Sequence, residues 1–219
     1  MHPFKEQVIN TFANLAHILE KADDDGLDVM CTSRSDRLEH DRRTERLVSF
    51  VRSSFRESTR NRCFIEASLN FLISKVIQDL PSGAGAQSKK RKGFMGLIGK
   101  SYKGRPISIY VLTNGVWNST QATSTCGADG PILQLIREIK DRNLRRDQVS
   151  IQFIRFGNDE TGIKRLTYLD DALMKDTGLD IVDHKASTSD VWSMLVGSLD
   201  EETDLFEGTA EGAPEDHSN

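Results

Sequence analysis

The sequence predicts an α/β fold: a three-layer sandwich in which helices cover both faces of a mostly parallel, Rossmann-like sheet. Two observations lead to this expectation. Segments with apolar residues at three- and four-residue steps alternate along the chain with short apolar or alternating runs, a pattern typical of helices that connect parallel strands. In addition, 219 residues are enough to bury a sizeable core in one domain.

The first half of the chain predicts helices wherever apolar residues recur on one face. These helices are expected over 4–21, 44–55 and 63–80. The short, mostly apolar run 27–32, which follows the breaker Gly26, predicts a strand. The polar stretch 33–43 predicts a surface loop.

The second half predicts alternating strands and helices. The continuous apolar run 107–112 predicts a central strand that is covered on both faces. Further strands are expected over 149–153 and 181–182, with helices over 131–139, 163–173 and 191–196. Functional loops of parallel sheets lie at the carboxyl ends of the strands. We expect these loops to start near Thr32, Thr113, Gly157 and Asp183.

Charge is distributed unevenly along the chain. The net charge is −4, yet residues 199–219 carry eight acidic residues and no Lys or Arg, and residues 81–105 carry seven Lys or Arg and no acid. We therefore expect one domain over 1–198, with a flexible basic loop over 82–105, and an acidic disordered tail over 199–219.

Composition also bears on location. The sequence contains no run of about 18 apolar residues, which excludes a transmembrane helix, and its start lacks the apolar core of a secretory signal. The three cysteines are few and widely spaced, which is typical of a reducing compartment. We expect an intracellular, cytoplasmic protein, with the nucleus as the alternative.

Several segments in order resemble a von Willebrand factor type A domain, in the form common in fungal intracellular proteins. The resemblance covers roughly residues 4–199. The segments are DGLDV (25–29), IYVLTNGVW (109–117), QFIRFGND (152–159), LDD (169–171) and DIVD (180–183). In this family, three loops at the top of the sheet form a metal-ion-dependent adhesion site, where an acidic group of a partner completes the shell of a magnesium ion.

The sequence departs from the family at all three metal-binding loops. The first strand and its Asp-x-Ser-x-Ser motif are absent, and the Thr position corresponds to Cys63, or to Thr59 or Ser58 if the loop shifts. In the third loop, Thr113-Asn114-Gly115, Asn114 replaces the Asp. An amide oxygen brings no charge, so a site formed by Cys63, Thr113 and Asn114 should bind magnesium poorly. We expect no metal or other cofactor, unless upstream sequence restores the site.

The missing strand would lie between the strands at 27–32 and 107–112, and its loss leaves two sheet edges unpaired. Three explanations are open: the two strands close up, another segment fills the slot, or the chain is a truncated product of a longer reading frame. The last is favoured.

The resemblance implies a non-catalytic protein-interaction module with a degenerate or absent adhesion site, a protein partner of unknown identity and no small-molecule substrate. The residues expected to contact the partner are Thr32, Cys63, Thr113, Asn114, Gly115 and Asn158. The alternative is a fragment of a longer magnesium-dependent binding protein whose first ligand motif lies upstream. An enzyme on a Rossmann-like sheet and a decaying gene fragment are further alternatives. No nucleophile–base pair or Gly-rich fingerprint in the sequence supports an enzyme.

The basic loop has its own alternatives. Lys89, Lys90, Arg91 and Lys92 precede an apolar stretch at 94–98. A solvated, disordered loop is the favoured interpretation. Contact with an anionic membrane surface or a nucleic acid is one alternative, and a nuclear import signal is another.

Overall fold

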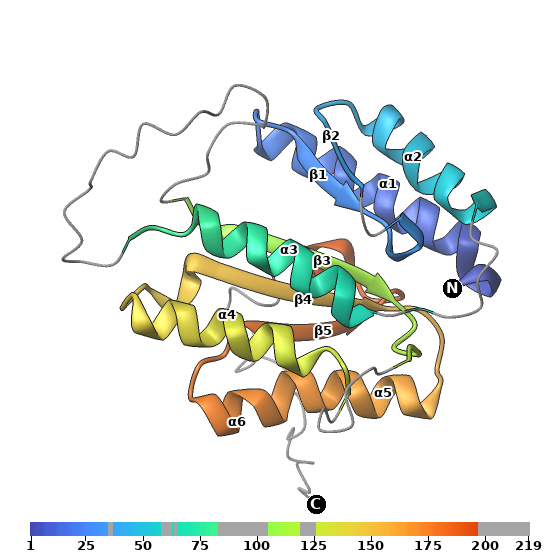
Figure 1. Ribbon diagram of the computed structural model, residues 1–219. Helices are drawn as coiled ribbons and strands as arrows, with labels where there is room; N and C mark the ends of the chain where they lie inside the picture. Colours follow the sequence, from blue (N-terminus) through green and yellow to red (C-terminus); the bar gives the residue numbers. More distant parts are fainter. Residues whose placement is uncertain (35–36, 58–62, 64, 83–104, 119–125, 197–219) are drawn as a thin grey trace, which may run out of the picture.

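The computed structural model describes residues 1–34, 37–57, 63, 65–82, 105–118 and 126–196. A parallel sheet of three strands lies at its centre: β3 (Ile107–Thr113), β4 (Val149–Arg155) and β5 (Val182–Ala186), in the order β3-β4-β5 (Figure 1). The described residues therefore confirm the predicted α/β class, with a parallel sheet flanked by helices.

The middle strand of this sheet is β4. Six of its seven residues are buried, and it pairs with β3 from Ile107↔Val149 to Thr113↔Arg155 and with β5 on its other side. The prediction that 107–112 forms the central strand is wrong, because among the described strands β3 pairs only with β4. A continuous apolar run indicates that both faces of a strand are covered, but it does not indicate whether both edges are paired.

Helices cover both faces of the sheet. On one face, a large apolar core joins Ile109, Ile151 and Phe153 to the helical layer. That layer consists of α3 (Ile65–Asp79), α4 (Asp129–Asp141), α5 (Glu160–Thr167), a π-helical turn (Tyr168–Ala172) and α6 (Leu173–Thr177). On the other face, Ile154 and Phe156 pack against α1 (Lys5–Ala22) and α7 (Val191–Val196).

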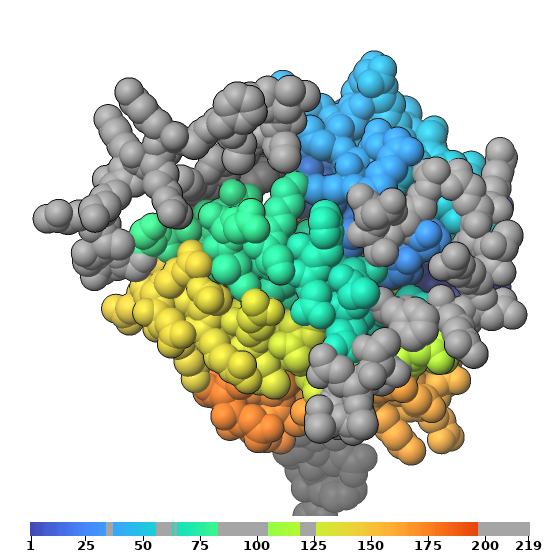
Figure 2. Space-filling view, viewed as in Figure 1, coloured from blue at the N-terminus to red at the C-terminus, as the bar shows by residue number. Residues whose placement is uncertain are grey.

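A separate antiparallel hairpin lies beside this sheet. It consists of β1 (Leu27–Met30) and β2 (Leu38–Asp41), and it packs with α1 and with α2 (Thr44–Glu57). Figure 2 shows the hairpin and α2 in blue above α3 and α4, which form one continuous surface in green and yellow.

The hairpin corrects the expected surface loop over 33–43, because this stretch contains β2. Only Leu38 is apolar in the sequence Leu-Glu-His-Asp of this strand. The strand forms through backbone pairing with β1, while its side chains stay largely at the surface, so its hydropathy gives no strand signal.

Some predictions lie outside the described residues. These are the acidic tail over 199–219 and almost all of the basic loop, including Lys89, Lys90, Arg91 and Lys92. In the parts of the chain that the structure describes, no helix combines the length and apolarity that crossing a membrane requires.

Candidate functional site

Three segments that are distant in sequence meet at the carboxyl ends of β1 and β3. The Cys63 thiol lies 3.6 Å from the Thr32 hydroxyl, which it can reach as a weak donor. The Cys63 carbonyl accepts a hydrogen bond from the Asn118 N–H at 2.8 Å. These contacts join the residues after β1, Cys63 two residues before α3, and the loop after β3.

The loop after β3 is stabilised by its own side chains. The Thr113 hydroxyl oxygen accepts the Gly115 N–H at 3.0 Å, and the Asn114 side-chain oxygen accepts the Val116 N–H at 3.3 Å. Short polar side chains commonly form such turns with the backbone two residues on. Two of the oxygens proposed as degenerate metal ligands therefore have a structural partner in this loop.

Close backbone packing fixes this loop on α5. Gly115 has a φ of +72°, and a Cβ atom built on it would lie 2.4 Å from the Gly162 Cα. A Cβ atom on Gly162 would lie 2.3 Å from the Asn114 carbonyl oxygen. The Asp159 carboxylate caps α5 by accepting the Gly162 N–H at 3.0 Å. Two glycines are required here because their backbones touch.

A buried tryptophan anchors the far end of the same loop. Arg165 on α5 donates to the Trp117 carbonyl at 2.8 Å, and its guanidinium lies 5.4 Å from the centroid of the Trp117 ring. The Trp117 indole N–H donates to the Cys126 carbonyl. Burial is the main cause that raises the pKa of the Cys126 thiol to about 11, so this thiol stays protonated at neutral pH.

One large apolar side chain of this region faces solvent. Val116 is 43% exposed, although its neighbours Gly115 and Trp117 are buried. We call Thr32, Cys63, Asn114 and Val116 the loop rim. The sequence predicted three of these four residues as partner contacts, and no sequence signal singled out Val116.

Asn158 follows the neighbouring strand β4 and has a different partner. Its side-chain oxygen accepts a hydrogen bond from Arg155 at 3.0 Å. Among the described residues it shares no hydrogen bond with the loop rim. Thr113, in contrast, is linked to the end of β4, because its carbonyl accepts the Phe156 N–H at 2.8 Å.

Within the described ranges, no three His, Cys, Asp or Glu residues form a group that could hold a metal ion. Cys63 and Asn114 contribute a thiol and an amide to the loop rim, and neither side chain carries the charge of a carboxylate. Their fit to a hard cation such as magnesium is poor on the chemistry of the donors alone.

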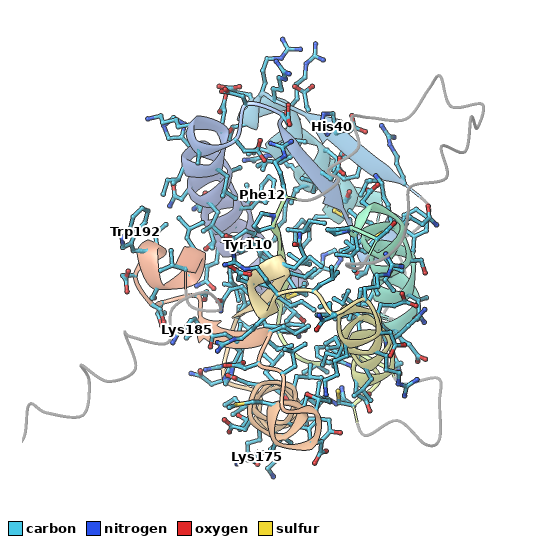
Figure 3. All side chains as sticks on the ribbon, turned by 90° about the vertical axis from the view of Figure 1, so that its left-hand side faces the viewer. Phe12, His40, Tyr110, Lys175, Lys185 and Trp192 are labelled. Carbon is cyan, nitrogen blue, oxygen red and sulfur yellow. The ribbon has the colours of Figure 1, made fainter. Side chains whose placement is uncertain are left out.

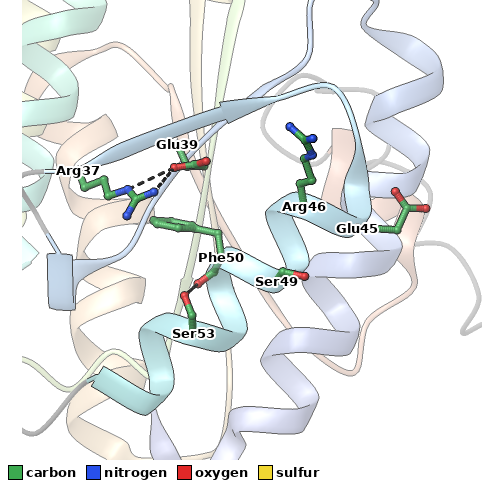
Figure 4. A pocket seen from close by; sticks show the side chains of 7 residues that line it. All are labelled: Arg37, Glu39, Glu45, Arg46, Ser49, Phe50 and Ser53. Carbon is green, nitrogen blue, oxygen red and sulfur yellow. Dashed lines mark hydrogen bonds and ion pairs between the residues drawn. The ribbon is translucent and has the colours of Figure 1, made fainter.

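A groove of about 430 Å³ lies between β2 and α2 (Figure 4). Arg37 crosses it, donating twice to one oxygen of Glu39, at 2.8 and 3.2 Å, with its guanidinium 5.4 Å from the centroid of the Phe50 ring. Arg46, also in the lining, bonds to Asp41 at 3.2 Å. Both cations of the groove are thus paired with carboxylates, and Glu45 adds a further carboxylate to the lining, so nothing in the groove favours an anionic ligand.

Comparison with known proteins gives no relative. No family model matches the chain, and neither a curated protein nor a solved structure matches it significantly.

Proposed function

We propose that this chain is a non-catalytic protein-interaction module that binds a partner protein through the loop rim. The observation that carries the proposal is the convergence of three separate segments at Cys63, through its 3.6 Å contact with Thr32 and its 2.8 Å hydrogen bond with Asn118. The rim combines an exposed apolar residue, Val116, with the hydroxyl of Thr32, the thiol of Cys63 and the amide of Asn114. Apolar contact at the centre with polar groups around it is typical of protein interfaces.

The rigidity of the loop after β3 supports the same proposal. The Gly115–Gly162 contact and the Arg165–Trp117 hydrogen bond hold both ends of this loop on α5. A surface that is already ordered loses less conformational entropy on binding than a flexible one. The loop therefore pays a smaller entropic cost on binding than a flexible loop of the same size.

The finer parts of the proposal concern type and location. The parallel sheet, the helices on both faces and the Thr113-Asn114-Gly115 loop support a von Willebrand A type of module with a degenerate adhesion site. No disulfide joins Cys31, Cys63 and Cys126, which supports a location in the reducing interior of the cell.

Site-specific photo-crosslinking tests the binding surface. Val116→p-benzoylphenylalanine places a crosslinker on the rim, and Met174→p-benzoylphenylalanine on α6 is the matched control, since these side chains are 43% and 47% exposed. Irradiation of cells that express the full chain should give a discrete adduct with a second protein only from position 116. The same adducts from both positions, or none from position 116, would refute the proposal.

A further inference from the structure

In the described part of the chain, the outer edge of β3 has no strand partner. Residues along a parallel strand direct their N–H and C=O groups alternately to the two sides. Because the Thr113 carbonyl accepts the Phe156 N–H, Ile109 and Val111 also direct their backbone groups to β4. Ser108, Tyr110 and Leu112 direct theirs away from it, and among the described strands β3 has no second neighbour.

The hairpin strand β1 lies opposite this edge. Asp25, two residues before β1, forms an ion pair with Arg105, two residues before β3. Thr32 and Cys63 meet beyond the other end of β1, and the Lys75 ammonium on α3 lies 3.4 Å from an Asp28 carboxylate oxygen on β1. The two strands therefore start at the same end and run side by side (Figure 1).

The side facing β3 is also the free edge of β1, since its only strand partner in the described part of the chain is β2. Hydrogen-bonded neighbours lie about 4.8 Å apart, so two strands with one strand between them lie about 10 Å apart. A separation of about 10 Å between the two strands is within reach of the ion pair between Arg105 and Asp25. We call the interval between these two facing edges the β1–β3 gap; neither edge has a strand partner among the described residues.

Both faces of the β1–β3 gap are bordered by apolar groups. Tyr110 and Leu112 lie on the side of α1 and α7, where the Tyr110 hydroxyl donates to the Leu195 carbonyl at 2.9 Å (Figure 3). Ile109 and Val111 face the core on the side of α3. Phe71, one helical turn before Lys75 on α3, is 45% exposed, and the i, i+4 spacing places it on the same side of the helix.

The β3 edge lacks the features that usually block strand addition. The segment Ile107–Thr113 contains no proline and no charged residue, and its register with β4 runs without a bulge. An extended chain can satisfy two facing edges at once, whereas a helix cannot, because its own backbone groups are already paired. The absence of charge along the edge favours an uncharged strand.

We propose that the β1–β3 gap binds an extended, uncharged apolar strand of a partner polypeptide, which pairs with both edges by β-augmentation. The strand needs uncharged side chains that can be buried on both faces, as the first six residues of β4 are. This inference goes beyond the loop rim, because it concerns another surface and another kind of contact, and either proposal can fail without the other.

The test uses a labelled hexapeptide with the first six residues of β4, Val-Ser-Ile-Gln-Phe-Ile, acetylated and amidated so that it carries no charge. This probe is chosen because β3 already pairs with that sequence on its other edge. Fluorescence anisotropy against the full chain should show saturable binding. Ser108→Pro should weaken it by roughly tenfold or more, since proline removes one edge N–H and its ring obstructs the incoming strand.

Matched controls separate this effect from a folding defect. Ser108 is exposed and its N–H points away from β4, so Ser108→Pro leaves the β4 ladder in place, while Ser108→Ala removes only the hydroxyl that accepts a hydrogen bond from Ser150. Ser108→Ala and the rim variant Val116→Ser should bind as the wild type does. A probe with N-methylated backbone should not bind. Absence of saturable binding to the wild type, or equal binding of the N-methylated probe, would overturn the inference.

Discussion

Replacing Gly162 with alanine tests how the loop after β3 is held. The added methyl group would lie 2.3 Å from the Asn114 carbonyl oxygen and 3.3 Å from the Gly115 Cα, whereas ordinary contacts of such an atom begin at 3.4 Å. Either the loop or the first turn of α5 must move by about 1 Å, because the atom in the way belongs to the backbone and cannot rotate aside.

The expected cost combines two opposed effects. Overpacking of this kind costs about 1–3 kcal/mol, and alanine gains up to about 1 kcal/mol in helix propensity over glycine. A φ penalty does not arise, because Gly162 is not in the left-handed region. We expect Gly162→Ala to lower the free energy of unfolding by about 1–2 kcal/mol.

Gly130→Ala is the matched control in the first turn of α4. No atom lies within 4 Å of the position that its Cβ would take. This variant should gain about 0.5–1 kcal/mol, because only the propensity effect remains. Urea unfolding followed by circular dichroism measures both variants. If Gly162→Ala were as stable as Gly130→Ala, the loop would not be seated on α5 as described.

Three further predictions concern Gln152, Asp183 and the three cysteines. Gln152 is 1% exposed and, among the described residues, neither of its side-chain polar atoms meets hydrogen-bond geometry with a partner, so Gln152→Met should raise the free energy of unfolding by about 1–2 kcal/mol in urea; a loss of stability would contradict this. Burial is the main cause that raises the pKa of the Asp183 carboxyl above its ordinary value of 3.8, against the opposing charge of Lys185. The folded state therefore binds the proton of the Asp183 carboxyl more tightly than the unfolded state does. The stability that this protonation contributes is fully present below pH 3.8 and is lost as the pH rises through the raised pKa. Asp183→Asn should remove this dependence, so its stability relative to the wild type should increase with pH across that interval in unfolding experiments; a constant difference would contradict it. Iodoacetamide at neutral pH should alkylate the half-buried Cys31 and Cys63 before Cys126, which is 1% exposed with a pKa of about 11, and mass spectrometry of the peptides would reveal the opposite order.

The helices were largely predictable because each has one apolar face. The predicted helix over 63–80 corresponds to α3, Ile65–Asp79, which buries Ile65, Leu69 and Ile73 against the sheet. The alternation of Val149, Ile151 and Phe153 likewise marked β4, where all three residues enter the same core. Periodicity reports which face of an element is buried, and these elements follow that rule.

Pairing and close approach were not predictable in the same way. The strand β2 is polar and forms through its backbone, and β3 has the composition of a central strand although it lies at the edge. The Gly115–Gly162 contact joins residues 47 positions apart in the sequence, and neither glycine has a local signal for a partner. Such features depend on which backbones meet in space, which a single sequence does not encode locally.

Residue-resolved amide hydrogen exchange in the free protein tests the open edge of β3 most directly. The amides of Ile109, Val111 and Thr113 point to β4 and should be strongly protected, whereas those of Ser108, Tyr110 and Leu112 point into the β1–β3 gap and should exchange much faster. This alternation along one strand is the expected result. Equal, strong protection of all six amides would show that the edge is already paired and would contradict the proposed strand-binding gap.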